Sequence, residues 1–391
     1  MTLKEKALKI HKDLQGKVEI SNKMPIDSRE IFGLLYSPGA AEPTREIQKN
    51  PETVYDYTWK QNTIAMVSNG TAVLGLGDVG PNAALPVIEG KSMLFRAFSN
   101  VGSVPLVLDT KDPDELIRTV EILAPTFGGI NLEDIKAPEC VYIEQELQRR
   151  LNIPVFHDDQ HGTAIVVLAA LMNAFKLIDK DLKTAKVVVS GTGAAGSSVI
   201  RMLHRYGLSN IHAYNIDGPV DNRRAKFYDP VVQEICNYIK PITDETTLHD
   251  LMQNADIFIG VSAAGVLTQE DVRVMASDAV VFAMANPVPE ISYDDAIAAG
   301  ARIAGTGRSD YPNQVNNVLA FPGIFQGALQ ARATEINEEM KIAAAYGIAS
   351  MISKNELTDT NILPYILDAD VADVVAKAVA EKAVAMGVVR D

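Results

Sequence analysis

The chain has 391 residues, of which 47% are hydrophobic, and its formal net charge at pH 7 is −14. This length fits two domains, each able to bury a core. The negative charge argues against nucleic acid and anionic membranes as partners, because both require a basic surface. The first residues mix charges and lead into no apolar run, so we expect no secretory signal. The two cysteines, Cys140 and Cys236, predict neither a disulfide framework nor a cysteine zinc site, which favours the reducing cytoplasm.

The first part of the chain alternates between helix-like and strand-like stretches. Apolar periodicity predicts strands and helices, in chain order, at 64–68 and 72–76 (strands), 82–97 and 113–123 (helices), 127–130 (strand), 138–151 (helix) and 154–156 (strand). The apolar stretch 163–175 is interrupted by Asn173 and is too short to cross a bilayer. We therefore predict a buried helix there.

From residue 185 the alternation becomes regular. Strands are predicted at 186–189, 211–215, 257–260, 279–283 and 302–304, with a helix reaching Tyr206 after the first of them. Such alternation indicates a parallel sheet covered on both faces. Alanine-rich helices at 338–352 and 370–386 either cover this sheet or fold back on the first half. The expected fold is α/β with two domains, 1–157 and 158–391, the second a Rossmann-type doubly wound parallel sheet with added C-terminal helices.

A glycine-rich turn directly follows the predicted strand 186–189. It reads Ser190-Gly191-Thr192-Gly193-Ala194-Ala195-Gly196 and opens a helix. In this setting Gly191 permits the tight turn, Gly193 lets the backbone approach a pyrophosphate, and Gly196 lets the helix pack against the strand. The pyrophosphate would then rest on free N–H groups at the helix N-terminus. The motif predicts a dinucleotide-binding site.

An acidic residue, Asp217, follows the next strand, 21 residues after Gly196. A carboxylate at this position hydrogen-bonds the 2′-hydroxyl of the ribose and repels a 2′-phosphate, so NAD is expected to be preferred over NADP. Arg223 and Arg224 lie close behind it and leave some use of NADP open. The alternative is a glycine turn with an unrelated surface aspartate.

Two acidic pairs follow predicted strands of the first half. They are Glu133-Asp134 and Asp158-Asp159. Because the carboxyl ends of neighbouring parallel strands face one crevice, these carboxylates can converge on an octahedral Mg²⁺ or Mn²⁺. The alternative is that the first pair forms a solvated turn and the second caps the following helix. His157 and His161 raise the possibility of zinc, but an all-oxygen ligand set fits better.

Lys91 and Tyr36 are further candidates for catalysis. Lys91 lies in an otherwise apolar, helix-like stretch, where a lysine usually extends to solvent. If it is desolvated near a metal, it can instead be neutral and act as a general base. Tyr36 stands where a helix ends before Ser37-Pro38-Gly39. By pattern alone, a tyrosine at such a turn is a packing or interface residue.

Taken together, these pieces resemble the malic enzyme family in its short bacterial form. The matching segments, in order, are Leu35–Gly39 with Glu42-Pro43, Gly75–Gly80, Glu89-Gly90-Lys91, Glu133-Asp134, Phe156–Ala164, Gly191–Gly196, Ala285-Asn286-Pro287 and Asn316–Gly323. They extend over most of the chain, from about residue 35 to 325. The resemblance implies oxidative decarboxylation of L-malate to pyruvate and CO₂ with NAD and a divalent metal, as well as decarboxylation of oxaloacetate.

The resemblance also implies roles for individual residues. Tyr36 would be the general acid and Lys91 the general base, with Asp158 as the neighbour that tunes Lys91. The metal ligands would be Glu133, Asp134 and Asp159. Asn286 and Asn317 would hold the substrate, and Asn286 would also contact the cofactor. A homodimer with the first domain at its interface is expected.

One segment departs from the family pattern. Larger members carry an arginine for a substrate carboxylate just before Gly-Leu-Gly-Asp, where this chain reads Thr71-Ala72-Val73-Leu74. Three alternative functions remain open. They are a malolactic-type lyase that retains NAD, a metal-free dehydrogenase of amino or hydroxy acids, and an NAD-binding regulatory protein.

Overall fold

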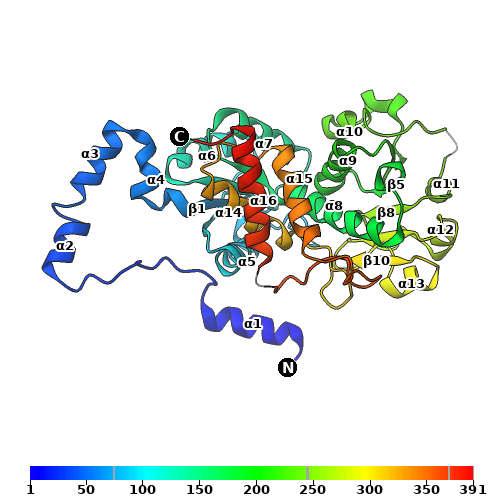
Figure 1. Ribbon diagram of the computed structural model, residues 1–391, viewed down its shortest axis with the longest axis horizontal. Coiled ribbons are helices and arrows are strands. Elements are labelled where there is room, and N and C mark those ends of the chain that lie inside the picture. Colours follow the sequence, from blue (N-terminus) through cyan, green and yellow to red (C-terminus); the bar gives the residue numbers. More distant parts are fainter. Residues whose placement is uncertain (74, 244–245, 369, 391) are drawn as a thin grey trace.

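The computed structural model describes residues 1–73, 75–243, 246–368 and 370–390. Two sheets lie in different halves of the molecule (Figure 1). The first has the order β2-β1-β3-β4 and is parallel throughout, with strands β1 (Thr63–Ser68), β2 (Gly102–Val107), β3 (Gly129–Leu132) and β4 (Val155–His157). Its connections include the helices α5 (Pro81–Ser99), α6 (Pro113–Leu123) and α7 (Glu139–Arg150).

The second sheet has the order β10-β9-β8-β5-β6-β7 and is parallel except for β7. Its strands are β5 (Lys186–Ser190), β6 (Asn210–Asn215), β7 (Gly218–Pro219), β8 (Ile257–Gly260), β9 (Val280–Ala283) and β10 (Ile303–Thr306). The associated helices are α9 (Ala194–Tyr206), α10 (Pro230–Ile235), α11 (Leu248–Met252), α12 (Gln269–Arg273) and α13 (Tyr293–Ala298). The chain adds strands on one side of β5 and then on the other, so the strand order reverses between β5 and β8. This confirms the predicted Rossmann-type doubly wound sheet.

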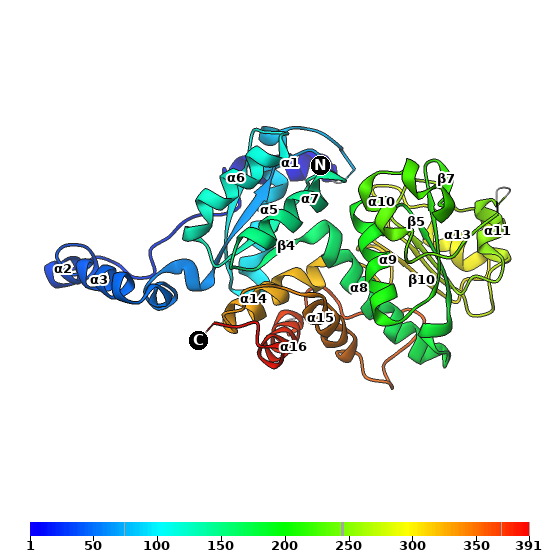
Figure 2. The same ribbon diagram turned by 90° about the horizontal axis from the view of Figure 1, so that it is seen from above.

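Helix α8 (Asp158–Ile178) leads from the first sheet to the second (Figure 2). Its 21 residues are almost all apolar after the first turn, and it packs against both α9 and α15. Within the described part of the chain it is the one helix long and apolar enough to cross a membrane, but 83% of the relevant window is buried inside the protein. The predicted buried helix is thus confirmed, and it starts earlier than expected.

The C-terminal helices fold back on the first sheet, which the sequence left open. They are α14 (Phe321–Gln330), α15 (Glu338–Ser350) and α16 (Val371–Met386). The ring of Phe95 in α5 lies 4.8 Å from that of Phe321 and 5.6 Å from that of Phe325, and the ring of Phe156 lies 5.9 Å from that of Phe325. Figure 2 shows α14 and α16 beside the first sheet. This aromatic cluster fixes α14 beneath the strands that carry the acidic pairs.

One local prediction is wrong, and one strand was not foreseen. The expected strand 72–76, of which Leu74 lies outside the described residues, is a turn in which Val73 and Gly77 exchange backbone hydrogen bonds of 2.8 and 3.0 Å. Gly75 and Gly77 have φ values of +72° and +74°, which a strand does not accommodate. Strand β2, which contains Pro105, was not among the predicted elements. Proline is tolerated there since β2 is at the edge of its sheet.

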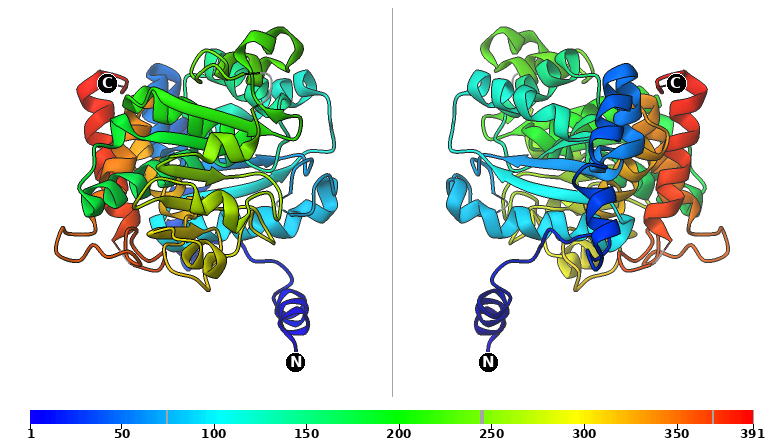
Figure 3. Two further views of the ribbon diagram at one scale, coloured as in Figure 1. Left: turned by 90° about the vertical axis from the view of Figure 1, so that its right-hand side faces the viewer. Right: turned by 90° about the vertical axis from the view of Figure 1, so that its left-hand side faces the viewer.

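The N-terminal segment stands away from both sheets. Its helices α1 (Leu3–Leu14), α2 (Arg29–Leu35) and α3 (Ala41–Lys49) contain no buried residue. Figures 1 and 3 show α1 clear of the body and α2 with α3 at the end of the molecule opposite the second sheet. The short helix α4 (Val54–Tyr57) then returns the chain to β1.

Candidate active site

Three carboxylates from two separate loops converge at the first sheet. Glu133 and Asp134 directly follow β3, and Asp159 lies in the first turn of α8, just after β4. Because β3 and β4 are parallel neighbours, their carboxyl ends meet at the same edge. One ligand oxygen from each of the three residues lies within 4.8 Å of the others. The convergence expected from the sequence is therefore present.

The donor set fits a hard divalent cation. Glu133 and Asp134 are each only 3% exposed, which rules out a solvated turn. Asp158 and Asp159 do not cap α8, because the side chain of His157 caps it instead. All three candidate ligands offer oxygen atoms, as Mg²⁺ and Mn²⁺ prefer. Among the described residues the candidate ligand group contains no histidine, because the side chain of His157 caps α8 and Nε2 of His161 lies 2.9 Å from Glu144.

Lys91 on α5 reaches into the carboxylates from the other side. Its Nζ lies 2.9 Å from Oε1 of Glu133, donates a hydrogen bond to Asp158 and lies 3.3 Å from Oδ1 of Asn317. The ammonium also sits 4.4 Å from the centre of the Phe321 ring. A lysine extending to solvent is thus excluded. The structure brings Lys91, Asp158 and Asn317 together beside the three candidate metal ligands.

The electrostatics of this group are dominated by excess negative charge. Burial by itself lowers the pKa of Lys91, but the carboxylates of Asp158, Glu133 and Asp159 outweigh burial and raise this pKa above its usual value. Burial raises the pKa of Asp158 to about 6 although Lys91 opposes the rise, and it raises that of Glu133 as well. The single positive charge of Lys91 therefore faces several buried carboxylates. Binding of a divalent cation to these carboxylates is strongly favoured in such a setting.

The glycine-rich turn forms a cradle for a dinucleotide. A Cβ at Gly191 would lie 2.5 Å from the backbone oxygen of Val261, and one at Gly196 would lie 1.8 Å from the oxygen of Gly191. At Gly193, by contrast, a Cβ would meet nothing within 4 Å, so this backbone faces open space. The adjoining cavity has a volume of about 760 Å³, and its lining includes Ser190, Gly191, Thr192, Gly193, Tyr214, Asp217 and Ser262. These features fit a pyrophosphate bound at the start of α9.

The predicted ribose contact also belongs to the lining of this cavity. Asp217 comes two residues after β6 and lines the cavity. Arg223 is held by Asp221 through hydrogen bonds of 2.7 to 3.1 Å. That pairing engages the guanidinium of Arg223 with a carboxylate of its own chain, while Asp217 lines the cavity.

Two other residues predicted for the site, Asn286 and Tyr36, are not part of the group around Lys91. Asn286 follows β9, and the backbone around it approaches Gly75, where an added Cβ would lie 3.4 Å from the oxygen of Asn286. The glycine turn of the first half thus touches a loop of the second half across the crevice. Tyr36 is not brought to the site of its own chain: it ends α2 and is 67% exposed.

Sequence reasoning missed two buried supporting residues. Asn131, fully buried in β3, donates a 3.2 Å hydrogen bond to Oε2 of Glu133. Glu144 on α7 accepts hydrogen bonds from the backbone N–H of His157 and from Gln160, and it pairs with His161. The signal for Asn131 was available, because a polar side chain within a buried strand needs a partner. Glu144 gave no such signal, since its helix is rich in charged residues.

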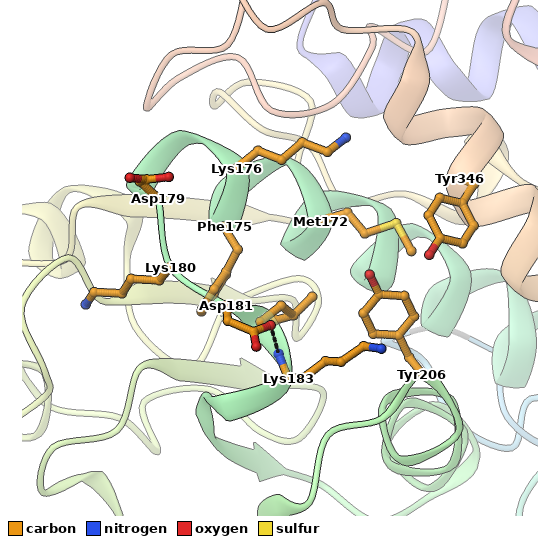
Figure 4. A pocket seen from close by; sticks show the side chains of 10 residues that line it. Met172, Phe175, Lys176, Asp179, Lys180, Asp181, Lys183, Tyr206 and Tyr346 are labelled. Carbon is orange, nitrogen blue, oxygen red and sulfur yellow. Dashed lines mark hydrogen bonds between the residues drawn. The ribbon is translucent and has the colours of Figure 1, made fainter.

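A separate hollow lies at the far end of α8, beyond the candidate site. It has a volume of about 400 Å³ and is lined by Phe175, Lys183, Tyr206 and Tyr346 among others (Figure 4). With a rise of 1.5 Å per residue, the 21-residue helix places it about 30 Å from Asp158. It contains none of the residues predicted for catalysis.

Fold and site together define a two-domain α/β protein in which a Rossmann dinucleotide cradle lies alongside a carboxylate cluster suited to a divalent metal. The description "Malic enzyme, N-terminal domain" matches residues 15–148, and "Malic enzyme, NAD binding domain" matches residues 160–384. The chain is 52% identical over 390 residues to a bifunctional malic/malolactic enzyme of Bacillus subtilis, covering 100% of this chain and 95% of that protein. It is 51% identical to an NAD-dependent malic enzyme of Geobacillus stearothermophilus, covering 96% and 78%.

Solved structures agree with these relatives. A malic enzyme from Pyrococcus horikoshii superposes with a TM-score of 0.95 at 43% identity, covering 100% of this chain and 92% of that one. An NAD-dependent malic enzyme from Thermotoga maritima gives a TM-score of 0.91 at 43% identity, covering 96% and 98%. The chain belongs to the malic enzyme family.

Proposed function

We propose that the protein oxidises L-malate with NAD and decarboxylates it to pyruvate and CO₂ in a reaction that depends on Mg²⁺ or Mn²⁺, and that it also decarboxylates oxaloacetate. The observation that carries the proposal is the contact of Lys91 with Glu133 and Asp158 beside the three-carboxylate cluster. The G-x-G-x-x-G cradle and Asp217 support NAD as the preferred cofactor.

In this proposal Glu133, Asp134 and Asp159 would hold the metal, which would supply Lewis-acid polarisation of the substrate, and the Gly191–Gly196 cradle would hold NAD, which would supply the acceptor for the hydride of C2. Lys91 removes the proton from the C2 hydroxyl. With a divalent cation held by these carboxylates, less of their charge would act on Lys91, and its pKa would lie lower, toward the range of a base. Asp158 holds the amine in place during the transfer.

Two asparagines are proposed to orient the substrate. Asn317 lies within hydrogen-bonding distance of Lys91 and is assigned to the substrate hydroxyl. Asn286, on the loop that borders the glycine turn of the first half, is assigned to a substrate carboxylate and to the cofactor. Thr71 does not replace the missing arginine, because its hydroxyl is engaged by Asn69 and by the backbone N–H of Lys136.

We further propose a homodimer in which Tyr36 protonates C3 of the product enol in the site of the partner subunit. The segment that carries Tyr36 exposes large apolar side chains, including Phe32 at 48% and Leu34 at 62%. On α5, Leu85 and Met93 are also exposed. Apolar surface of this kind marks a protein contact. Exchange of these segments between two copies would cover both surfaces and bring Tyr36 to the helix that carries Lys91.

The division into domains at 157/158 and a cytoplasmic location are parts of the same proposal. The boundary is supported by the two separate sheets, which α8 connects starting at Asp158, although the C-terminal helices α14 and α16 pack back against the first domain. A reducing compartment is supported by Cys140 and Cys236, which are both free and buried.

The direct test is the production of NADH from L-malate in the presence of Mn²⁺, followed by absorbance. We expect turnover that stops when a chelator is added and that is slower with NADP than with NAD. Turnover that survives chelation would point to a metal-free dehydrogenase. Tight binding of NAD with no turnover of malate or oxaloacetate would point to a regulatory protein.

A second candidate function is malolactic conversion with NAD retained. The similarity to a relative described as a bifunctional malic/malolactic enzyme, at 52% identity, favours testing it. In that case lactate accumulates from malate while no NADH is released. Lactate and pyruvate measured in the same reaction distinguish the two.

A further inference from the structure

A buried carboxylate outside the metal cluster joins three strand ends of the cofactor crevice. Glu290, in the loop that follows β9, is fully buried. Its Oε1 accepts hydrogen bonds from the backbone N–H of Ser262 at 2.7 Å and from the Ser262 hydroxyl at 3.0 Å. Its Oε2 accepts from the backbone N–H of Ala285 at 3.1 Å. The Ser262 hydroxyl in turn lies 2.9 Å from that of Ser190 at the end of β5.

The packing around this carboxylate is close. An added Cβ on Gly260, the last residue of β8, would lie 2.4 Å from the carboxyl carbon of Glu290. Among the residues that the structure describes, no lysine, arginine or histidine forms an ion pair with Glu290. A carboxylate is purely an acceptor, and here its partners are neutral N–H and O–H groups. Its negative charge is therefore solvated by loop dipoles and is not cancelled by a cation.

The sheet order indicates at which end of a bound dinucleotide this group would lie. The ribose contact, Asp217, follows β6, and the pyrophosphate cradle lies between β5 and α9. Since β8 and β9 lie on the opposite side of β5 from β6, the rest of a bound dinucleotide extends toward the loops after β8 and β9. Those loops carry Ser262 and Ala285, the two residues that Glu290 holds.

We propose that Glu290 makes the cofactor site discriminate between oxidation states, because its buried charge stabilises the positively charged nicotinamide ring of NAD over the neutral ring of NADH. The proposal rests on the proposed use of NAD and adds a property that neither the cradle nor Asp217 provides. A nearby unit charge in a partly buried site acts on the charged ring and leaves the neutral ring almost unaffected. The arrangement favours binding of the oxidised cofactor and release of the reduced one.

The test compares the dissociation constants of NAD and NADH for the full-length protein without substrate, by calorimetry for NAD and by fluorescence for NADH. In Glu290→Gln we expect the affinity for NAD to fall about tenfold more than that for NADH, the order of effect expected when one charge is removed from a partly buried site. The matched control is Ser262→Ala, which disturbs the same loop and keeps the charge. There we expect both affinities to change by the same factor.

An equal loss of affinity for NAD and for NADH in Glu290→Gln would show that Glu290 only supports the loop. Unchanged affinities would show that Glu290 neither supports the cofactor site nor discriminates between the oxidation states. If Glu290→Gln does not fold, the affinities of ADP-ribose, NAD and NADH for the wild-type protein test the proposal instead. ADP-ribose lacks the ring, so its affinity gives the contribution of each ring by difference. The oxidised ring is expected to contribute more, and an equal or larger contribution from the reduced ring overturns the proposal. Absence of malate turnover in the wild-type protein, with NAD binding retained, would instead contradict the proposed function alone.

Discussion

A heterodimer made from two inactive chains tests whether Tyr36 works in the site of its partner. One chain carries Lys91→Ala and the other Tyr36→Phe. Each homodimer lacks one proton-transfer group in both sites, so its rate should fall by roughly 10²–10⁴-fold. In the structure Lys91 lies within the carboxylate cluster, whereas Tyr36 is exposed on a segment that projects away from it (Figure 1).

The expected recovery follows from counting sites. If the segments are exchanged, one site of the heterodimer combines the intact Lys91 of one chain with the intact Tyr36 of the other, and the second site lacks both. The heterodimer should then show about half of the wild-type activity per dimer. If each Tyr36 serves its own chain, no site is complete and the rate stays at the level of the parents.

The assay requires two different affinity tags, co-expression and sequential purification, followed by NADH production from L-malate. Sedimentation of each preparation checks that all three dimers are assembled. A heterodimer no faster than either parent would refute the exchange. Full activity in Tyr36→Phe homodimers would instead refute the role of the tyrosine, and full activity in Lys91→Ala homodimers that of the lysine.

Three further outcomes follow from the geometry. Asp159→Asn removes one of the three anionic ligands, and Mn²⁺ affinity measured by calorimetry should fall by at least the 10–100-fold typical for loss of a supporting group, while NAD affinity is retained. Burial opposes ionisation of Glu144, but His161 and Lys341 outweigh it and lower its pKa to about 2. Because this folded-state pKa lies below the unfolded value, Glu144 contributes about 3 kcal/mol that is present above pH 4.5 and is lost as the pH falls toward 2. Urea unfolding of Glu144→Gln should accordingly be less pH-dependent over that interval, and an unchanged pH profile would contradict the assigned ion pair. Asp217→Ser removes the charge that repels a 2′-phosphate, so the ratio of kcat/KM for NADP to that for NAD should rise at least tenfold, and a constant ratio would show that another group sets the preference.

Much of the second half could be predicted from the sequence because its signals are local. In the turn Gly191–Gly196, Gly191 has a φ of +100° and Gly196 has no room for a Cβ, and the turn stands between a strand and a helix whose patterns are short-range. The acidic pairs were placed correctly for a similar reason: each directly follows a strand, and parallel strands end at one edge. The prediction of a strand at 72–76 was wrong because glycines with positive φ override an apolar pattern.

Non-local packing decided the rest. The C-terminal helices could not be assigned to either half from their pattern, and the contacts of Phe321 and Phe325 with Phe95 resolve the choice. The charge state of Lys91 is likewise set by carboxylates 42 and 67 residues further along the chain, which no local pattern relates to it.

The sequence by itself thus determined the family, the cofactor cradle and the identity of the acidic groups, since these depend on residue type and short-range order. Only the tertiary structure decided how they act together: that Lys91 shares its charge with Glu133 and Asp158, that Glu290 joins the loops after β8 and β9, and that Tyr36 is turned away from its own site. Electrostatic coupling and burial depend on distances in space, and distances between remote segments are fixed only when the chain has folded.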